Sequence, residues 1–413
     1  MNILVFEDSL VDNLYPVTTG RPAYAITCGS FRLLDWLVQL GKPLSGWVRP
    51  HLKTLQSLDF PELNQELSAA NRWTLLANAR LVPSRANFLQ LQKLLARENR
   101  CEIRSDNSLA AAVLPTEQLR VHDGNIVAAL DAAGPSATAP MSPATELPLL
   151  NFPHEIIRWN VECFVDNLRH RIDSSHYREV AKDVFVGEGA TLGEFIVTDT
   201  KAGPIVLDRD SQIGPYCFLR GPAYLGPGAR VIEHAAIKDC VSLGHTTKIG
   251  GEIEASVIEP YTNKQHHGFL GHSYLGSWIN LGAGTCNSDL KNTYGEVKLD
   301  FRGQKLATGM QFVGCVMGDY AKTAINTGIF TGKIVGTCSM VYGFVTTNVP
   351  SFVNYARSFG QVTELPPSVM ESTQKRMFAR RQVQQRPCDI QLLHDMYQLT
   401  RNERQLAEEP LVL

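Results

Sequence analysis

The chain has 413 residues, enough for two or three domains, since single hydrophobic cores stop growing near ~250 to 300 residues. Its 39 Lys and Arg almost balance its 41 Asp and Glu, and the net charge of −2 favours neither a polyanion nor an anionic membrane. We therefore exclude nucleic acid and the membrane as main partners.

The cysteines and the N-terminus predict a cytoplasmic protein. The nine cysteines are scattered, with no C-x-x-C pair, so we expect reduced thiols and no structural metal. Residues 1–8 have no basic stretch and become acidic after a short apolar run. No run of about 18 apolar residues follows, so we expect neither a signal peptide nor a membrane span.

The first part of the chain predicts an α/β domain over residues 1–130. Residues 2–6 (NILVF) and 73–77 (WTLLA) are short apolar runs typical of buried strands. Residues 31–40 and 86–99 carry apolar side chains at helical spacing. Strands alternating with helices indicate an open sheet covered by helices.

A linker and a connecting helix are expected over residues 131–182. Residues 131–147 are rich in Ala, Pro, Ser and Thr and bury too little apolar surface to fold alone. Residues 153–172 return to helical spacing and predict a helix that leads into the next domain.

The strongest pattern is a period of six within residues 183–360. Eight aliphatic residues follow one another six apart: Leu207, Ile213, Leu219, Leu225, Val231, Ile237, Leu243 and Ile249. This period, with small turn residues between, predicts a solenoid of short strands. The pattern resumes at Phe269, Leu275 and Leu281 and again from Met317 to Val341, and we expect irregular loops at 258–268 and 286–311.

Residues 361–413 predict a helical tail. Its arginines, Arg376, Arg380, Arg381 and Arg386, are typical of a solvated face or a subunit contact. Loops that leave a rigid solenoid are where function is usually placed. The alternative is a solenoid that only displays other parts of the chain.

Two stretches resemble known transferases. Residues 279–287, Ile-Asn-Leu-Gly-Ala-Gly-Thr-Cys-Asn, are similar to a segment of the bifunctional bacterial N-acetylglucosamine-1-phosphate uridyltransferases/glucosamine-1-phosphate acetyltransferases. Residues 13–18, Asn-Leu-Tyr-Pro-Val-Thr, with Arg21-Pro22 look like a stretch of sugar-1-phosphate thymidylyltransferases. The chain is most similar to the divergent sugar-nucleotidyltransferase group built on the same plan.

The resemblance implies the fold, the assembly and the co-substrate. It implies a Rossmann-like nucleotidyltransferase-like domain followed by a left-handed parallel β-helix of hexapeptide repeats and a short helical tail. It also implies a homotrimer, with acetyl-CoA or another acyl-CoA bound between neighbouring subunits. A sugar phosphate or a sugar nucleotide is the small-molecule partner it implies.

The resemblance places a catalytic base at His266, fourteen residues before Asn280. Acyl transfer from a thioester needs a neutral nucleophile, and imidazole, which titrates near ~6.5, suits the removal of its proton at neutral pH. The alternative is that His266 and His267 are loop histidines in water or at a subunit contact.

Further positions carry roles implied by the resemblance. Phe269 stands where the family has a substrate-contacting Tyr, and Lys238 is the nearest match to a substrate-binding Arg. Asn280 and Asn287 are candidate substrate-binding or loop-orienting groups, and the residues expected to contact CoA are Ile325 and Gly343.

Both halves depart from the family pattern. Glu254 replaces the Lys that holds the sugar phosphate, so we expect glucosamine 1-phosphate to be a poor acceptor. In the front half, residues 6–12 contain three carboxylates and no glycine, and Asn78 lies where a Gly-Asp pair would bind Mg²⁺. Arg21 and Arg80 are candidate contacts to nucleotide or sugar phosphate, with structural ion pairing as the alternative.

Three functions follow from these patterns. The first is CoA-dependent acyl transfer to an amino sugar or sugar phosphate on the trimeric solenoid. The second is sugar-1-phosphate nucleotidyl transfer in the N-terminal domain, which would require Mg²⁺. The third is a non-catalytic protein that binds a sugar nucleotide.

Overall fold

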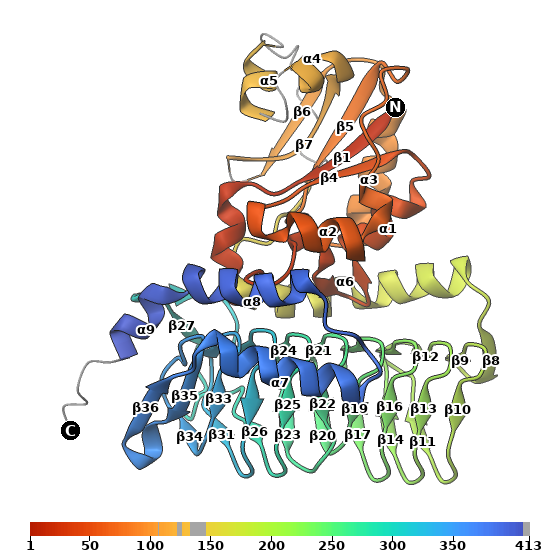
Figure 1. Cartoon of the computed structure of the whole chain (residues 1–413). Helices are drawn as coiled ribbons and strands as arrows, with labels where there is room; N and C mark the ends of the chain where they lie inside the picture. The colour runs from red at the N-terminus through yellow and green to blue at the C-terminus, as the bar shows by residue number, and fades with distance from the viewer. Residues whose placement is uncertain (106, 122–125, 133–145, 408–413) are drawn as a thin grey trace. The chain divides into compact units, whose positions relative to one another are not determined.

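A computed structural model describes residues 1–105, 107–121, 126–132 and 146–407 (Figure 1). The chain divides into two compact units. The first contains Met1–Leu14, Arg21–Ile26 and Phe31–Asn151, and the second contains Tyr15–Gly20, Thr27–Ser30 and Phe152–Leu413. Two short segments near the N-terminus therefore fold with the solenoid, which the sequence did not predict.

The first unit is built on a sheet of five strands in the order β4-β1-β5-β7-β6. The strands are β1 (Asn2–Phe6), β4 (Leu44–Trp47), β5 (Trp73–Asn78), β6 (Cys101–Ser105) and β7 (Ser108–Pro115). Its helices are α1 (Leu33–Gln39), α2 (Lys53–Asp59), α3 (Arg85–Leu95), α4 (Thr116–Val121) and α5 (Ile126–Ala132). Four 3-10 turns lie at Ser9–Leu14, Ala23–Ala25, Pro50–Leu52 and Pro61–Leu63.

Strand β1 lies at the centre of the parallel part of this sheet. It pairs in parallel with β4 on one side and β5 on the other, and all five of its residues are buried, as the apolar run requires. The carboxyl ends of β4, β1 and β5 therefore lie at the same edge of the sheet. Because β4 and β5 lie on opposite sides of β1, the strand order reverses at β1. The predicted α/β class is confirmed.

The predicted linker at 131–147 falls mostly on residues 133–145, which lie outside the described part of the chain. The predicted connecting helix is present as α6 (Pro153–Ser174). Pro153 occupies its first turn, where no backbone donor is needed, and Phe152 N–H donates to the Glu155 carboxylate at 3.3 Å. Phe164 and Leu168 of α6 pack against Val206 of the solenoid.

The solenoid is a triangular prism of parallel strands. One face contains β10 (Thr191–Leu192), β13 (Gln212–Ile213), β16 (Arg230–Val231), β19 (Lys248–Ile249), β22 (Asn263–Lys264), β25 (Asn280–Leu281), β30 (Lys322–Thr323), β33 (Met340–Val341), β35 (Val353–Ala356) and β36 (Gln361–Glu364). We call it face 1.

Face 2 follows face 1 in each coil. It contains β11 (Val197–Asp199), β14 (Phe218–Arg220), β17 (Ala236–Lys238), β20 (Glu252–Glu254) and β23 (Phe269–Gly271), continued by β26 (Cys286–Asn287), β31 (Gly328–Ile329) and β34 (Phe344–Val345). Face 3 contains β9 (Val184–Val186), β12 (Ile205–Leu207), β15 (Ala223–Leu225), β18 (Val241–Leu243), β21 (Val257–Ile258), β24 (Tyr274–Leu275), β29 (Cys315–Met317) and β32 (Lys333–Val335).

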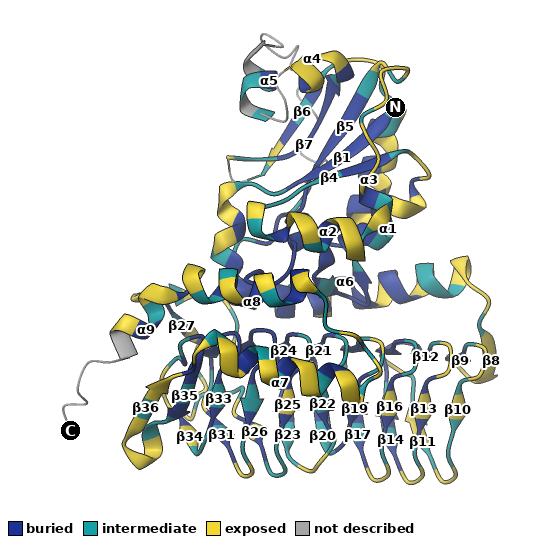
Figure 2. Ribbon diagram, viewed as in Figure 1, coloured by how far each residue is buried: buried dark blue, intermediate teal, exposed yellow. Residues whose placement is uncertain are grey.

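The interior of the prism confirms the six-residue period. All eight aliphatic residues from Leu207 to Ile249 belong to one buried core, which runs along the column as Figure 2 shows. Two details of the prediction were wrong. Leu270, not Phe269, points inward, and the expected loop at 258–268 is a regular coil in which Lys264 occupies the inward position. A buried lysine hid the repeat, because the pattern was sought in aliphatic residues.

The second expected irregular segment does leave the prism. After β26, residues 288–312 form an insertion that contains the antiparallel hairpin β27 (Lys298–Phe301) and β28 (Gln304–Ala307). The chain then returns to face 3 at β29. The insertion is where the sequence predicted functional loops.

At each end of the prism, one of the three faces is extended by an antiparallel strand. Strand β8 (Arg178–Ala181) pairs with β9 on face 3, and β36 pairs with β35 on face 1, so that these two edges have partners. A small pair, β2 (Thr27–Cys28) and β3 (Phe31–Arg32), precedes α1, and a 3-10 turn at Arg357–Phe359 precedes β36.

The predicted helical tail is present as α7 (Pro367–Arg380), α8 (Pro387–Leu399) and α9 (Arg401–Ala407). Helix α7 packs on a prism corner, where the Phe378 ring lies 4.4 Å from that of Trp278. Arg381 donates to Asn263 on face 1, and Arg386 pairs with Asp389, so these two arginines make internal contacts. Within the described residues, no helix has the length and apolarity to cross a membrane.

Candidate functional site

The edge of the first unit where β1 and β5 end is occupied by an ion pair. Arg80 Nε donates to Asp8 Oδ1 at 2.8 Å and Nη2 to Asp8 Oδ2 at 2.7 Å. The other three donors bind the carbonyl of Leu150, Asn151 Oδ1 and Ser108 Oγ. A guanidinium has five N–H groups, so every donor of Arg80 is used within the protein.

Asp8 is held as a carboxylate by this arrangement. Burial alone would raise its pKa, but the hydrogen bonds and charge of Arg80, together with the amide of Asn78, hold the pKa below its ordinary value. The side chain of Arg80 is fully buried. The phosphate contact predicted for Arg80 stays a prediction, and the geometry favours the alternative of structural ion pairing.

A second ion pair neutralises the neighbouring carboxylate of the acidic loop. Glu7 Oε2 accepts from the backbone N–H and from Nε of Arg49, both at 3.0 Å, and Oε1 accepts from Ala23 N at 2.9 Å. Arg21 is also buried, and its carbonyl accepts from Arg49 at 3.1 Å. Both carboxylates that follow β1 are therefore committed to neighbouring arginines.

The end of β5 does not fit a magnesium site. Asn78 donates to Asp8 Oδ2 and to the carbonyl of Leu109, each at 2.8 Å, and its Oδ1 accepts from Arg80 N. Magnesium prefers carboxylate oxygens, and the one carboxylate in this network already binds a guanidinium. No group of three or more His, Cys, Asp or Glu in the described residues could hold a metal ion.

The Tyr-Pro-Val-Thr stretch belongs to the second unit. The Tyr15 hydroxyl donates to Glu403 Oε2 at 2.6 Å, and the same oxygen accepts from Ser351 N at 2.9 Å. A side chain at Gly20 would meet Met396 of α8. Residues that resemble a nucleotide-binding motif are thus packed between the prism and the C-terminal helices.

One corner of the prism, between faces 1 and 2, carries three of the predicted residues. His266 and Ile325 are the second residues of the turns at 265–268 and 324–327, and Gly343 ends the turn at 342–343. Backbone hydrogen bonds join successive turns, such as Asn326 N to Ala283 O at 2.7 Å. His266 and Ile325 are exposed, and they stand two coils apart, roughly 10 Å along the axis.

The inward Lys264 lies beneath the His266 turn. Its Nζ donates to the carbonyls of His266 at 2.8 Å and Gly250 at 3.1 Å. Burial lowers the pKa of Lys264 to about 8, while Cys286 acts in the opposite direction. The ammonium therefore ties the histidine turn to the preceding coil, a contact that the sequence did not predict.

Lys238 and Glu254 stand in register on face 2. Lys238 Nζ lies 2.5 Å from Glu252 and 3.1 Å from Glu254, so two carboxylates surround one ammonium. Burial alone would lower the pKa of Lys238, but these two carboxylates raise it. Phe269 of β23 is in register with Glu252. Lys238 as a substrate contact stays a prediction.

Asn280 and Asn287 differ in their surroundings. Asn280 is exposed on face 1 and is in register with Asn263 and Lys322. Asn287 is buried, its Oδ1 accepts from Gly271 N at 2.9 Å and its Nδ2 donates to Gly271 O at 3.0 Å. Asn287 therefore connects two coils, whereas Asn280 makes no such contact in these hydrogen bonds and its role as a substrate contact stays a prediction.

A histidine that the sequence analysis missed lies at the other end of β23. His272 Nδ1 lies 2.8 Å from Asp289 Oδ2, and its ring stacks on Phe312. Asp289 is seventeen residues after His272, the same interval that separates the paired Glu254 and Gly271. That interval, one coil length, is the sequence pattern that could have indicated the pair.

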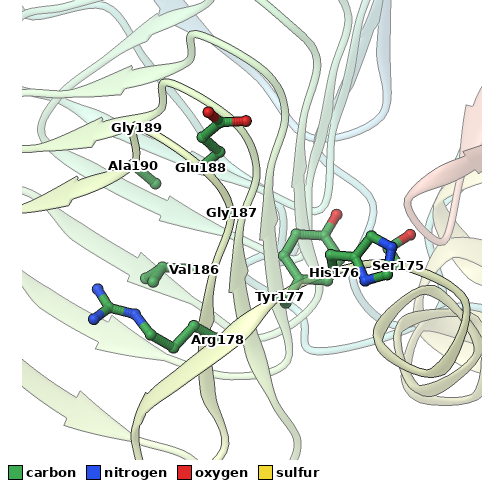
Figure 3. Close-up of a pocket in the computed structure, with 9 residues that line it drawn as sticks. All are labelled: Ser175, His176, Tyr177, Arg178, Val186, Gly187, Glu188, Gly189 and Ala190. Carbon is green, nitrogen blue, oxygen red and sulfur yellow. The ribbon is translucent and has the colours of Figure 1, made fainter.

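A cavity of about 490 Å³ lies at the N-terminal end of the prism (Figure 3). Ser175, His176 and Arg178, which line it, are exposed, so it is an open surface hollow. None of the predicted site residues lines it.

Comparison with known proteins finds a matching family for the first part of the chain and several curated relatives. Residues 3–170 match the family described as sugar nucleotidyl transferase. The chain is 27% identical over 148 residues to a bifunctional sugar-1-phosphate nucleotidylyltransferase/acetyltransferase of Sulfurisphaera tokodaii, which covers 35% of this chain and 37% of that protein. It is 29% identical over 119 residues to the bifunctional protein GlmU of Methanococcus vannielii, covering 29% and 28%.

A third relative is the bifunctional protein GlmU of Acidithiobacillus ferrooxidans, 33% identical over 137 residues, which cover 32% of this chain and 27% of that protein. The chain thus spans well under half the length of these curated relatives. Their names confirm the resemblance to bifunctional sugar-nucleotide enzymes that residues 279–287 predicted.

Among solved structures, a UDP-N-acetylglucosamine acyltransferase of Francisella novicida is similar at 16% identity and a TM-score of 0.33, covering 57% of this chain and 79% of that one. The Arabidopsis enzyme of the same name is similar at 14% identity and a TM-score of 0.19, covering 57% and 86%. At these scores the similarity supports no argument about function.

Proposed function

We propose that this chain, a divergent relative of the bifunctional sugar-nucleotide enzymes, is a transferase that moves an acyl group from acyl-CoA to a sugar on its β-helix. The observation that carries the proposal is the alignment of His266, Ile325 and Gly343 along one corner of the prism. The resemblance had placed the base and the coenzyme contacts at these residues, and the coil geometry brings them to a common edge.

The reaction class follows from the groups at this corner. Acyl transfer needs a base that takes a proton from the acceptor and a rigid surface that positions the thioester, and it needs no metal. The exposed turn at 265–268 offers imidazole, with His266 as the base predicted from the sequence. Acetyl-CoA or another acyl-CoA supplies the activated acyl group when it is bound.

The acceptor that we propose is an amino sugar that carries no phosphate group next to Glu254. Lys238 is already shared by Glu252 and Glu254, so this group of three carries one net negative charge. A phosphate beside it would be repelled, whereas a protonated amine or hydroxyl groups would be attracted or accepted as donors. Phe269 in the next coil offers an apolar surface for a sugar ring.

Nucleotidyl transfer by the first unit is the second candidate, because residues 3–170 match the sugar nucleotidyl transferase family. The local chemistry does not support catalysis there. Arg80 has no free donor for a phosphate, and the Asp8 carboxylate is bound to it. The residues at the end of β5 do not fit Mg²⁺, so no step is assigned to the metal; binding of a sugar nucleotide without turnover is the third possibility.

We propose that the chain assembles as a homotrimer and that it is located in the cytoplasm. Ile325, Phe330 and Phe344 lie on or beside the corner of His266 and are at least half exposed. A row of exposed apolar side chains on a rigid sheet supports contact with further copies of the chain. The free cysteines agree with a reducing compartment.

Thiol release from acetyl-CoA tests the proposal. The full chain is incubated with acetyl-CoA and a panel of amino sugars, neutral sugars, their 1-phosphates and their nucleoside diphosphate derivatives. Acceptor-dependent thiol release is expected, strongest with an unphosphorylated amino sugar. Pyrophosphate release from nucleoside triphosphates and sugar 1-phosphates, without thiol release, would support the second candidate instead.

A further inference from the structure

His272 and Asp289 form a hydrogen-bonded pair on adjacent coils of the prism. His272 Nδ1 lies 2.8 Å from Asp289 Oδ2, and the side chains are 18% and 14% exposed. A carboxylate accepts and cannot donate, so Nδ1 carries a proton, and in the neutral imidazole Nε2 is the nitrogen with the lone pair. Among the described residues, nothing hydrogen-bonds Nε2. A proton acceptor held in one tautomer, with its lone pair unused, is the arrangement of a general base.

The insertion at 288–312 holds this imidazole at both of its ends. Asp289, the second residue of the insertion, binds Nδ1, while Phe312, its last residue, stacks on the ring, with centroids 5.1 Å apart and an angle of 25° between the planes. The two ends pair with each other, since Val313 N donates to Asp289 O at 2.9 Å. Gly314 N donates to the carbonyl of His272 at 2.7 Å. The ring is therefore fixed in position and orientation.

The His272–Asp289 pair lies next to the row of charged residues on face 2. Lys238, Glu254 and Gly271 are in register on successive strands, and His272 directly follows Gly271. His272 N donates to the carbonyl of Glu254 at 3.0 Å. The imidazole therefore lies beside the groups to which we assigned the acceptor, at the opposite end of β23 from His266. Three strand residues separate the two ends, roughly 10 Å.

The His266 ring is not held by contacts of the kind that hold His272. Its side chain is exposed, and in the described part of the chain no group hydrogen-bonds its ring. Only its backbone carbonyl is fixed, by Lys264 at 2.8 Å. An imidazole free to rotate in water is less well prepared to take a proton from a bound acceptor than one held by a carboxylate.

We infer that His272 and Asp289 are the acid–base dyad of the acyl transfer, with His272 as the catalytic base and Asp289 as its positioning residue. The inference rests on the proposed function and names its base. Nε2 takes the proton of the acceptor N–H or O–H while the acceptor atom bonds to the thioester carbonyl carbon. The C–S bond then breaks, and the imidazolium returns the proton to the departing CoA sulfur, so that the free thiol and the acylated sugar are the products.

The test compares four variants in the thiol-release assay. His272→Ala is expected to lose at least about 100-fold in kcat/KM, the usual contribution of a general base. Asp289→Asn removes the negative charge that fixes the tautomer, and we expect a loss of about 10-fold or more with an altered pH profile. The matched control is Asp300→Asn, an exposed carboxylate of the insertion, which should stay within about 3-fold. His266→Ala is the competing variant, and the dyad predicts that it loses less activity than His272→Ala.

A second measurement does not depend on turnover. Nitrogen chemical shifts of His272 should place its proton on Nδ1 in the wild type and show a mixture of tautomers in Asp289→Asn. If His272→Ala unfolds, His272→Gln takes its place. Full activity in a folded His272 variant, with loss in His266→Ala, overturns the dyad but leaves the proposed function intact. A wild type that acylates no acceptor overturns the proposed function, and the dyad with it.

Discussion

Arg80 donates hydrogen bonds to both carboxylate oxygens of Asp8, at 2.8 and 2.7 Å. Its other three N–H groups donate to oxygen atoms of Leu150, Asn151 and Ser108 in the same unit. We predict that Arg80→Met lowers the free energy of unfolding by about 3 kcal/mol, because it leaves a largely buried carboxylate without its cation. Urea denaturation of the full chain measures the change. Arg104→Met removes a half-exposed arginine whose partner lies 3.4 Å away and should cost under about 0.5 kcal/mol.

The same variant has a defined pH dependence. The folded pKa of Asp8 lies below the ordinary value of 3.8, so its stabilising contribution is present above that pH and is lost as pH falls through the lower folded pKa. The stability gap between wild type and Arg80→Met should therefore narrow as the pH falls below 3.8. A gap that stays constant down to pH 3 would show that the ion pair does not stabilise the fold.

Much of the fold follows from local patterns. The aliphatic residues from Leu207 to Ile249 fix the prism because each coil needs one inward side chain per face. The strands at 2–6 and 73–77 were found because buried parallel strands are continuous apolar runs. The packing of Tyr15–Gly20 with the solenoid was not predictable, because its partners Ser351 and Glu403 are more than 300 residues away.

The candidate site was predictable only in part. The resemblance gave the corner that carries His266, Ile325 and Gly343, but it could not give the contacts of His272 and Asp289, which depend on coil length. Two successive coils near the site are shorter than eighteen residues, since Lys238 and Glu254 are paired at an interval of sixteen and Glu254 and Gly271 at seventeen. A strict six-residue period loses its register there, and together with the polar Lys264 at the inward position this hid the coil at 258–268 from the sequence pattern.

Lys264 makes a second pH-dependent prediction. Its pKa falls from 10.5 in the unfolded chain to about 8 in the fold, so below pH 8 the folded protein carries the full cost of a buried ammonium. Between pH 8 and 10.5 the unfolded chain binds more protons, and stability rises with pH. Relative to Lys264→Met, the wild type should gain on the order of 3 kcal/mol across this range.

Urea denaturation of both proteins at one-unit pH steps measures this gain. Lys305→Met is the control, since Lys305 is exposed and should show no such trend. A stability difference between wild type and Lys264→Met that is independent of pH would mean that Lys264 is not buried as a charged group.

Alanine variants of Asn287 and Asn280 should distinguish a residue that stabilises the fold from one that binds a ligand. Asn287→Ala leaves the N–H and carbonyl of Gly271 without their side-chain partner, and we expect a loss of about 2 kcal/mol in the free energy of unfolding. Asn280→Ala changes an exposed side chain and should alter stability by less than about 0.5 kcal/mol. If Asn280 binds the acceptor, its variant raises KM at unchanged stability; equal destabilisation by both variants would contradict the two roles.

Glu254 should set the choice of acceptor. Glu254→Lys turns the net charge of its group with Lys238 and Glu252 from negative to positive, and we expect at least a tenfold shift in kcat/KM from an amino sugar towards its 1-phosphate. Glu254→Gln, which removes one charge, should shift the ratio in the same direction by less. An unchanged ratio in both variants would place the acceptor away from face 2.

The central claim, acyl transfer to a sugar on the prism, is tested most directly by mass spectrometry of an amino sugar incubated with acetyl-CoA and the purified full chain. The account predicts a product heavier by one acetyl group, formed only when protein is present and lost together with thiol release when the solenoid site is inactivated. An unchanged sugar after prolonged incubation, across the whole panel of amino and neutral sugars, would contradict it.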